Sequence, residues 1–174
     1  MSMRAKDKAA LEARAALEAK AGVEASQPVP AARSVSRLAV VQGLYQMDMA
    51  HTDLNAVIEQ FVLYRFGEQA RFDFADADPA FFGDLLRGVV AHQRVIDPLL
   101  DGQLATGWRL ARIDSILRAV LRAGAFELLQ RQDVPTAVII NEYVEVAHAF
   151  FSGEEPKVVN GVLDALAKKV RVGV

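Results

Sequence analysis

One row of side chains in this sequence could contact a nucleic acid. Its four members stand four residues apart, beginning with two cations and ending with an aromatic ring: Arg33, Arg37, Val41 and Tyr45. On a helix they would lie along one slowly turning ridge about 18 Å long. Guanidinium groups donate paired hydrogen bonds to phosphates, and a tyrosine ring can stack on an unpaired base. No acid occurs between residues 26 and 47, so the spacing indicates a surface that could follow one RNA strand.

The same residues have an ordinary structural interpretation. Arg33 and Arg37 could solvate one face of a helix while Tyr45 packs in the core. The residues alone leave both interpretations open.

Catalytic and metal-binding patterns are incomplete. Glu145 and His148 form one Glu-x-x-His pair, whereas a di-iron bundle needs two such pairs and two further glutamates. The most similar second pair is Asp48 with His51, which has aspartate in place of glutamate and lies near a predicted helix end. The chain has three histidines, no cysteine, no G-x-S-x-G and no glycine-rich phosphate loop. We therefore predict no enzyme activity, no catalytic residue, no metal and no cofactor.

Composition favours one soluble domain. The 174 residues are 52% hydrophobic and 24% charged, which suffices for a core. The absence of cysteine excludes disulfides and favours a reducing compartment, and no apolar run reaches the ~18 residues of a membrane helix. We predict a cytoplasmic protein without membrane contact. Because the net charge is -2, RNA contact would require a local patch.

The elements that position these residues are predicted to be helices throughout. Residues 1–31 form an Ala-rich helical extension with a proline-containing linker, and residues 32–174 form the folded domain. Apolar patterns predict helices over residues 33–49, 54–65 and about 80–97. Three further helices are predicted to carry the apolar stripes from Ile113 to Leu128, from Ile139 to Phe150 and from Val158 to Val170. Pro98 is expected to break or restart the third of these helices. Arg122 and Glu142 are expected to form a partly buried pair. The fold class is therefore all-α.

Three segments together resemble the NusB family of transcription antitermination factors. They are AARSVSRLAVVQGLYQ (31–46), RAVLRAGAFELL (118–129), and DVPTAVIINEYVEVA (133–147) joined to VVNGVLDALA (158–167). Their order and spacing also match, so the resemblance covers about residues 31–171. It implies about seven helices arranged as two three-helix bundles. It also implies binding of boxA-type single-stranded RNA together with the small-subunit ribosomal protein NusE. In that family the pair loads onto RNA polymerase and promotes antitermination on ribosomal RNA operons.

The resemblance also assigns residues. It places Lys157 and Asn160 beside the RNA, where Lys157 could bind a phosphate and Asn160 a base edge or backbone group. A solvated lysine and a helix-satisfying asparagine are the ordinary alternatives. It places the ribosomal-protein contact near Asp114 and near Glu154 and Glu155, although this acidic pair could instead cap a helix.

The sequence departs from the family where members often carry arginine, at Ser34 and Val35. We therefore expect that tight RNA binding needs the protein partner. The alternative function is a non-enzymatic helical adaptor or homodimer that engages proteins without contacting RNA.

Overall fold

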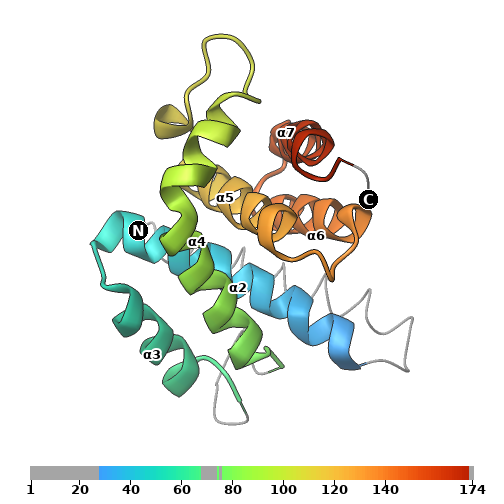
Figure 1. Cartoon of the computed structure of the whole chain (residues 1–174). Helices are drawn as coiled ribbons and strands as arrows, with labels where there is room; N and C mark the ends of the chain where they lie inside the picture. Colours follow the sequence, from blue (N-terminus) through green and yellow to red (C-terminus); the bar gives the residue numbers. More distant parts are fainter. Residues whose placement is uncertain (1–27, 68–73, 75, 173–174) are drawn as a thin grey trace.

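The computed structural model describes residues 28–67, 74 and 76–172. Within these residues six α-helices and one 3-10 helix follow one another (Figure 1): α2 (Pro28–Ala50), α3 (Leu54–Tyr64), α4 (Pro79–Asp101), η1 (Leu110–Arg112), α5 (Ser115–Gln130), α6 (Thr136–Phe150) and α7 (Glu155–Val170). Apart from an isolated bridge between Phe66 and Phe74, this part of the chain consists of helices and connections. The all-α prediction is confirmed. The helix predicted within residues 1–24 lies outside the described residues, and the domain division at residue 31 stays a prediction.

Local sequence explains where several helices begin. An aspartate side chain accepts a hydrogen bond from a backbone N–H group in the first turn of three helices: Asp53 for α3, Asp78 for α4 and Asp114 for α5. These N–H groups have no partner within the helix, so a capping carboxylate stabilises each start. Proline occupies the first turn of α4 and of α7, where its missing N–H costs nothing.

Two predicted features of helix ends were wrong. The stretch interpreted as a linker is helical from Pro28 onward, because proline is tolerated in a first turn. Pro98 does not break α4, which continues to Asp101. The neighbouring Ile96 and Leu100 are both fully buried, so core packing on either side holds the last turn in helical form despite the lost hydrogen bond.

The helices form the two expected three-helix bundles. Helices α2, α3 and α4 pack on one another, as do α5, α6 and α7, and the bundles join where α5 packs on α2 and α4. In Figure 1, α5 and α6 lie between α2 and α7. Ion pairs fix the direction of α2, because Arg37 pairs with Glu127 and Asp48 with Arg118. Thus α2 runs antiparallel to α5.

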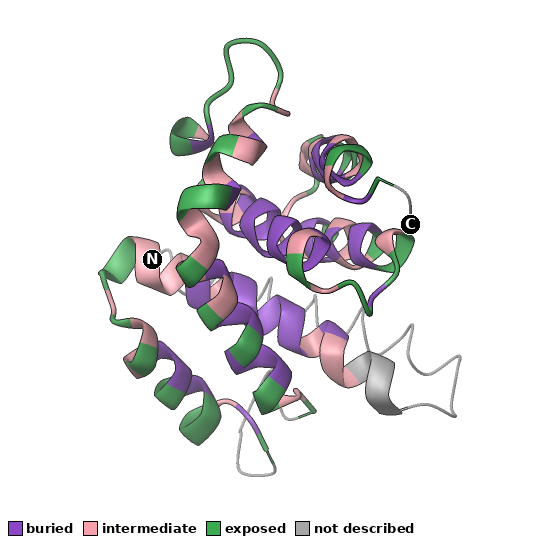
Figure 2. Cartoon of the chain, viewed as in Figure 1, coloured by how far each residue is buried: buried purple, intermediate pink, exposed green. Residues whose placement is uncertain are grey.

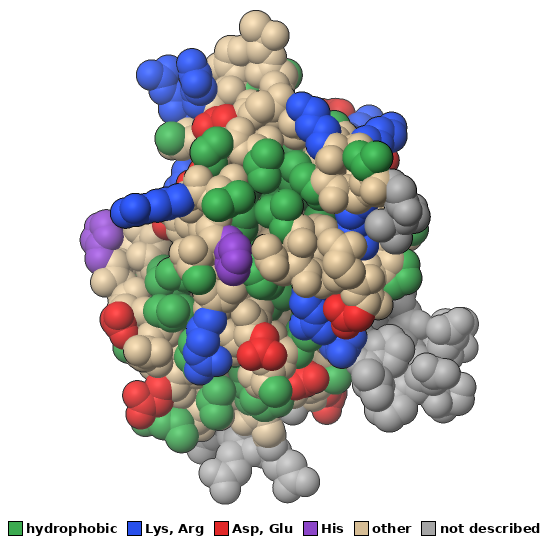
Figure 3. Space-filling view, viewed as in Figure 1, with side chains coloured by type: hydrophobic (Ala, Val, Ile, Leu, Met, Phe, Trp, Pro, Cys, Tyr) green, Lys and Arg blue, Asp and Glu red, His purple; other side chains and the backbone are tan. Residues whose placement is uncertain are grey.

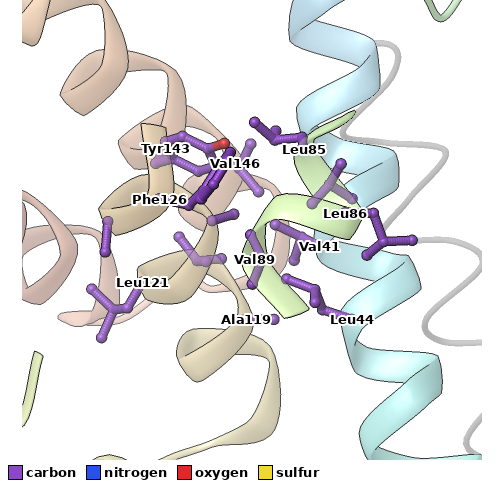
Figure 4. Packing of buried hydrophobic residues seen from close by; sticks show 14 of the residues in the cluster. Val41, Leu44, Leu85, Leu86, Val89, Ala119, Leu121, Phe126, Tyr143 and Val146 are labelled. Atoms are coloured by element: carbon purple, nitrogen blue, oxygen red, sulfur yellow. The ribbon is translucent and has the colours of Figure 1, made fainter. Parts of the chain in front are cut away.

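Helix α5 forms the centre of the core. Its residues from Ala119 to Leu128 are all buried, and Figure 2 shows burial along most of its length. Figure 4 shows how side chains of α2, α4 and α5, including Val41, Leu86 and Val89, meet in one layer. The helices approach closely at Gly88, where an added Cβ would lie 2.1 Å from the Phe126 ring. A glycine is therefore required there for α4 to pack on α5.

Candidate functional site

The structure does not present the predicted α2 row as one exposed ridge. Val41 is fully buried and Arg37 is only 3% exposed, whereas Arg33 and Tyr45 are half-buried. Helix α2 is surrounded along its middle because it packs on α3, α4, α5 and α6. The prediction that Arg37 contacts RNA was therefore wrong, since its guanidinium group points into the protein.

Arg37 instead belongs to a buried polar network. Its guanidinium group donates two hydrogen bonds, of 2.8 and 2.9 Å, to the Glu127 carboxylate, which also accepts one from the Tyr143 hydroxyl. The Glu142 carboxylate lies 3.7 Å from the Arg37 guanidinium group. Burial by itself lowers the pKa of Arg37, but the hydrogen bonds and charge of Glu127 outweigh it and raise the pKa. Burial, with the charge of Glu127, also raises the pKa of Tyr143 well above its ordinary value. The network joins α2, α5 and α6.

The predicted pair between Arg122 and Glu142 was also wrong. Arg122 binds both carboxylate oxygens of Asp97 at 2.9 Å, while Glu142 faces Arg37. Periodicity placed both residues on apolar-rich helices, but it could not show which faces of α4, α5 and α6 meet.

Arg33 lies in the N-terminal part of α2, where three arginines contact the ring of Phe81. The guanidinium carbons of Arg33, Arg37 and Arg131 lie 5.0, 5.1 and 5.3 Å from the centre of the Phe81 ring. Arg131 also binds Asp133 with two hydrogen bonds of 2.9 Å. These bonds lower the pKa of Asp133 to about 2. Of the three arginines, Arg33 and Arg131 retain partial exposure.

The acidic residues assigned to a protein partner lie around one groove. The groove has a volume of about 440 Å³, and its walls include Asp114, Glu154 and Glu155. Leu117 and Val158 add apolar surface. It opens between the α4–α5 connection, the start of α5 and the start of α7. The structure thus brings all three predicted partner residues together, although they come from two distant parts of the sequence.

Lys157 and Asn160 lie on the exposed side of the start of α7. The Lys157 ammonium group lies 3.3 Å from the Glu154 carboxylate, and both side chains are about 80% exposed, so this pair holds Lys157 only weakly. Lys157 pairs with Glu154, which lines the groove at the N-terminal end of α5. Arg33 shares the Phe81 ring with Arg131, which follows the C-terminal end of α5. The structure therefore does not bring Lys157 beside Arg33.

Surface charge is not gathered into a single basic area on the face shown in Figure 3. Lys and Arg side chains are interspersed there with Asp and Glu. Among the described residues, no group of three His, Cys, Asp or Glu side chains could hold a metal ion. Within the same residues, no helix has the length and apolar character needed to cross a membrane. His148 is exposed at the end of α6, and the Glu-x-x-His spacing remains without further ligands in this part of the chain.

A model of the NusB family matches residues 34–168. The chain belongs to the NusB family. It is 53% identical to the Transcription antitermination protein NusB of Caulobacter vibrioides over 140 residues, covering 80% of this chain and 94% of the relative. It is 51% identical to the protein of that name in Allorhizobium ampelinum over 141 residues, covering 80% of this chain and 88% of the relative.

Solved structures show the same NusB fold. T. maritima NusB is 30% identical with a TM-score of 0.68, over 79% of this chain and 91% of that one. A chain from a complex of the antitermination factors NusB and NusE with dsRNA is 21% identical, with a TM-score of 0.62, over 79% of this chain and 96% of that one. This second likeness shows the fold alone.

Sequence reasoning on this NusB-family chain missed three residues of the groove. Trp108, Arg109 and Arg112 line it together with the acidic residues, and Trp108 is 49% exposed. Trp108 is the one tryptophan of the chain and stands in a glycine-containing connection, where an exposed aromatic ring is a signal for binding. Arg131 was missed because its significance depends on Phe81, which lies 50 residues earlier.

Proposed function

We propose that this NusB-family chain is a transcription antitermination factor that binds boxA-type single-stranded RNA together with the ribosomal protein NusE. It joins the RNA polymerase antitermination complex and supports transcription of ribosomal RNA operons. It acts in the cytoplasm by binding, without catalysis. The observation that carries the proposal is the identity with the Caulobacter antitermination protein across nearly its full length.

The groove supports the protein-binding half of the proposal. The wall of the groove carries the three carboxylates of Asp114, Glu154 and Glu155 against the two cations of Arg109 and Arg112, so its net charge is negative, and Leu117 with Trp108 offers apolar surface. A ribosomal protein is basic because it binds RNA, so its cations complement this wall. One carboxylate oxygen of Glu155 is buried without a hydrogen-bond partner in the described structure. A bound donor would satisfy this oxygen.

Four residues support the RNA-binding half. Arg33 and Lys157 provide cations for phosphates, Tyr45 an aromatic ring, and Asn160 an amide for a base edge or backbone group. They lie on two helices, Arg33 and Tyr45 on α2 and Lys157 and Asn160 on α7, and they are not collected in one place. Since Arg37 is committed to Glu127, two of these four residues, Arg33 and Lys157, supply the cations for phosphates. The partner therefore supplies part of the RNA-binding surface.

Two titrations test the proposal. The first measures NusE binding to the full chain and to the double variant Glu154→Gln/Glu155→Gln. We expect roughly tenfold weaker binding, equivalent to about 1.4 kcal/mol. Asp164→Asn, which removes an exposed acid farther along α7, is the matched control and should bind normally. The second measures boxA RNA binding with and without NusE, and Lys157→Ala should weaken it in both conditions.

The adaptor or homodimer function is the second candidate, favoured by the burial of Arg37 and Val41. It predicts NusE binding or self-association with no RNA binding in either condition. That result would refute the RNA-binding half of the proposal.

A further inference from the structure

The ring of Phe81 brings together two surface arginines from distant helices. Phe81 lies in the first turn of α4 and is 4% exposed. Arg33 of α2 and Arg131 after α5 each place a guanidinium group against it, at 5.0 and 5.3 Å from the ring centre. Cation–π contacts of this kind hold long side chains in place. Both guanidinium groups are therefore fixed at one end of the protein, where they are half-buried.

The Arg131 guanidinium group is oriented to bind an anion with two oxygens, because it binds the Asp133 carboxylate in this way. The two Asp133 carboxylate oxygens each accept a hydrogen bond of 2.9 Å from Arg131, and the charge of Arg33 also acts on this carboxylate. A phosphate presents two oxygens to a guanidinium fork in the same way. Arg33 Nε is buried and lacks a hydrogen-bond partner in the described residues. The Asp133 side chain is 56% exposed, so a phosphate could take its place.

The C-terminal end of a helix normally disfavours an anion, because its last carbonyl groups carry partial negative charge. Arg171 changes that here. Its buried guanidinium group donates hydrogen bonds to the carbonyl oxygens of Glu127, Leu128 and Arg131, at 3.0, 2.8 and 2.7 Å. A positive charge therefore offsets the end of α5 directly beneath the turn that carries Arg131.

We propose that Arg131 and Arg33 form a binding site for one phosphodiester of single-stranded RNA, and that Asp133 occupies this site in the free protein. Bound RNA displaces the carboxylate from the Arg131 fork. The inference rests on the RNA binding proposed above and adds a contact from α5, together with an acidic residue that competes with RNA.

Fluorescence anisotropy of boxA RNA with the full chain and NusE tests the inference. Arg131→Ala should weaken binding roughly tenfold, about 1.4 kcal/mol, and reduce the salt slope by about 0.7, the value for one phosphate contact on a single strand. Arg131→Lys should keep the salt slope but lose part of the affinity, because an ammonium group lacks the fork. Asp133→Asn should strengthen binding by up to about fivefold, the range of an exposed ion pair.

The opposite effects of Arg131→Ala and Asp133→Asn on RNA affinity distinguish an RNA contact from a structural role. If Arg131 only stabilises the turn through Asp133, Arg131→Ala and Asp133→Asn should shift the melting temperature in the same direction, and neither should change the salt slope of RNA binding. That result overturns the inference and leaves the proposed function intact. Arg94→Ala removes an exposed arginine of α4 about 20 Å from Phe81 along the helix, and it should not change affinity more than twofold. Absence of RNA binding by the wild-type chain with NusE would overturn both the inference and the proposed function.

Discussion

Replacing Arg37 by methionine separates a buried structural role from an RNA contact. Methionine keeps much of the volume of the side chain but removes the partner of Glu127, a carboxylate that is fully buried. Glu127 would retain only the Tyr143 hydroxyl as a donor. We expect a large loss of stability and no direct effect on RNA binding, because the Arg37 side chain is only 3% exposed.

The magnitude follows from this geometry. Breaking a buried ion pair from one side costs about 3–5 kcal/mol, because it leaves an uncompensated charge. With a urea slope of about 2 kcal/mol per molar, the unfolding midpoint should fall by about 2 M. The double variant Arg37→Met/Glu127→Gln should lose less than Arg37→Met alone, since it removes both charges. Arg33→Ala, at a half-buried position, should cost less than about 1 kcal/mol.

Urea unfolding followed by circular dichroism measures these losses, and RNA titration at low temperature measures the affinity of the folded variant. If Arg37→Met unfolded at the wild-type midpoint and yet lost RNA binding, the buried-network interpretation would be wrong. A double variant that is less stable than Arg37→Met would likewise contradict the charge argument.

Three further variants test the packing and the electrostatics. Gly88→Ala should destabilise by about 1–3 kcal/mol, because its Cβ would collide with the Phe126 ring, whereas Gly161→Ala, with open space around it, should be neutral or stabilising; equal effects in thermal melts would contradict the packing. The pKa of Tyr143 is raised in the folded state. The contribution of Tyr143 to the free energy of unfolding is therefore complete below the unfolded-state pKa of about 10, and it is lost as the pH rises from that value through the folded-state pKa. Tyr143→Phe should reduce this alkaline loss of stability in urea titrations, and an unchanged pH profile would count against it. Arg171→Leu should cost about 3 kcal/mol, because several buried carbonyl groups lose their donor; hydrogen exchange should show the end of α5 opening, and unchanged protection would refute the role.

Much of the fold could be predicted from local patterns. Apolar periodicity identified α5 and α7, and Pro135 marked the start of α6. These signals act within a few residues. Asp114 acts as the cap of α5, a role that its position before an apolar run allows. Pro98 was misjudged because burial of Ile96 and Leu100 is a property of the packed bundle.

The candidate site was less accessible to sequence reasoning. Arg33 and Arg37 share one residue type and one helix, yet Arg37 is buried because Glu127 meets it from 90 residues away. Such pairings depend on which helix faces meet, and a single sequence does not contain that information. The acidic residues of the groove came from the family resemblance, while Trp108 and Arg131 became visible only with the structure.

The salt dependence of boxA RNA binding by the full chain with NusE is the sharpest measure of whether this protein binds RNA through phosphate contacts. We expect the logarithm of the binding constant to fall linearly with the logarithm of salt concentration, with a slope of about 0.7 per phosphate contact. We also expect that omitting NusE weakens RNA binding and makes this slope less steep. RNA binding that is absent with NusE present, or that is independent of salt, would contradict the claim that this chain is an RNA-binding antitermination factor.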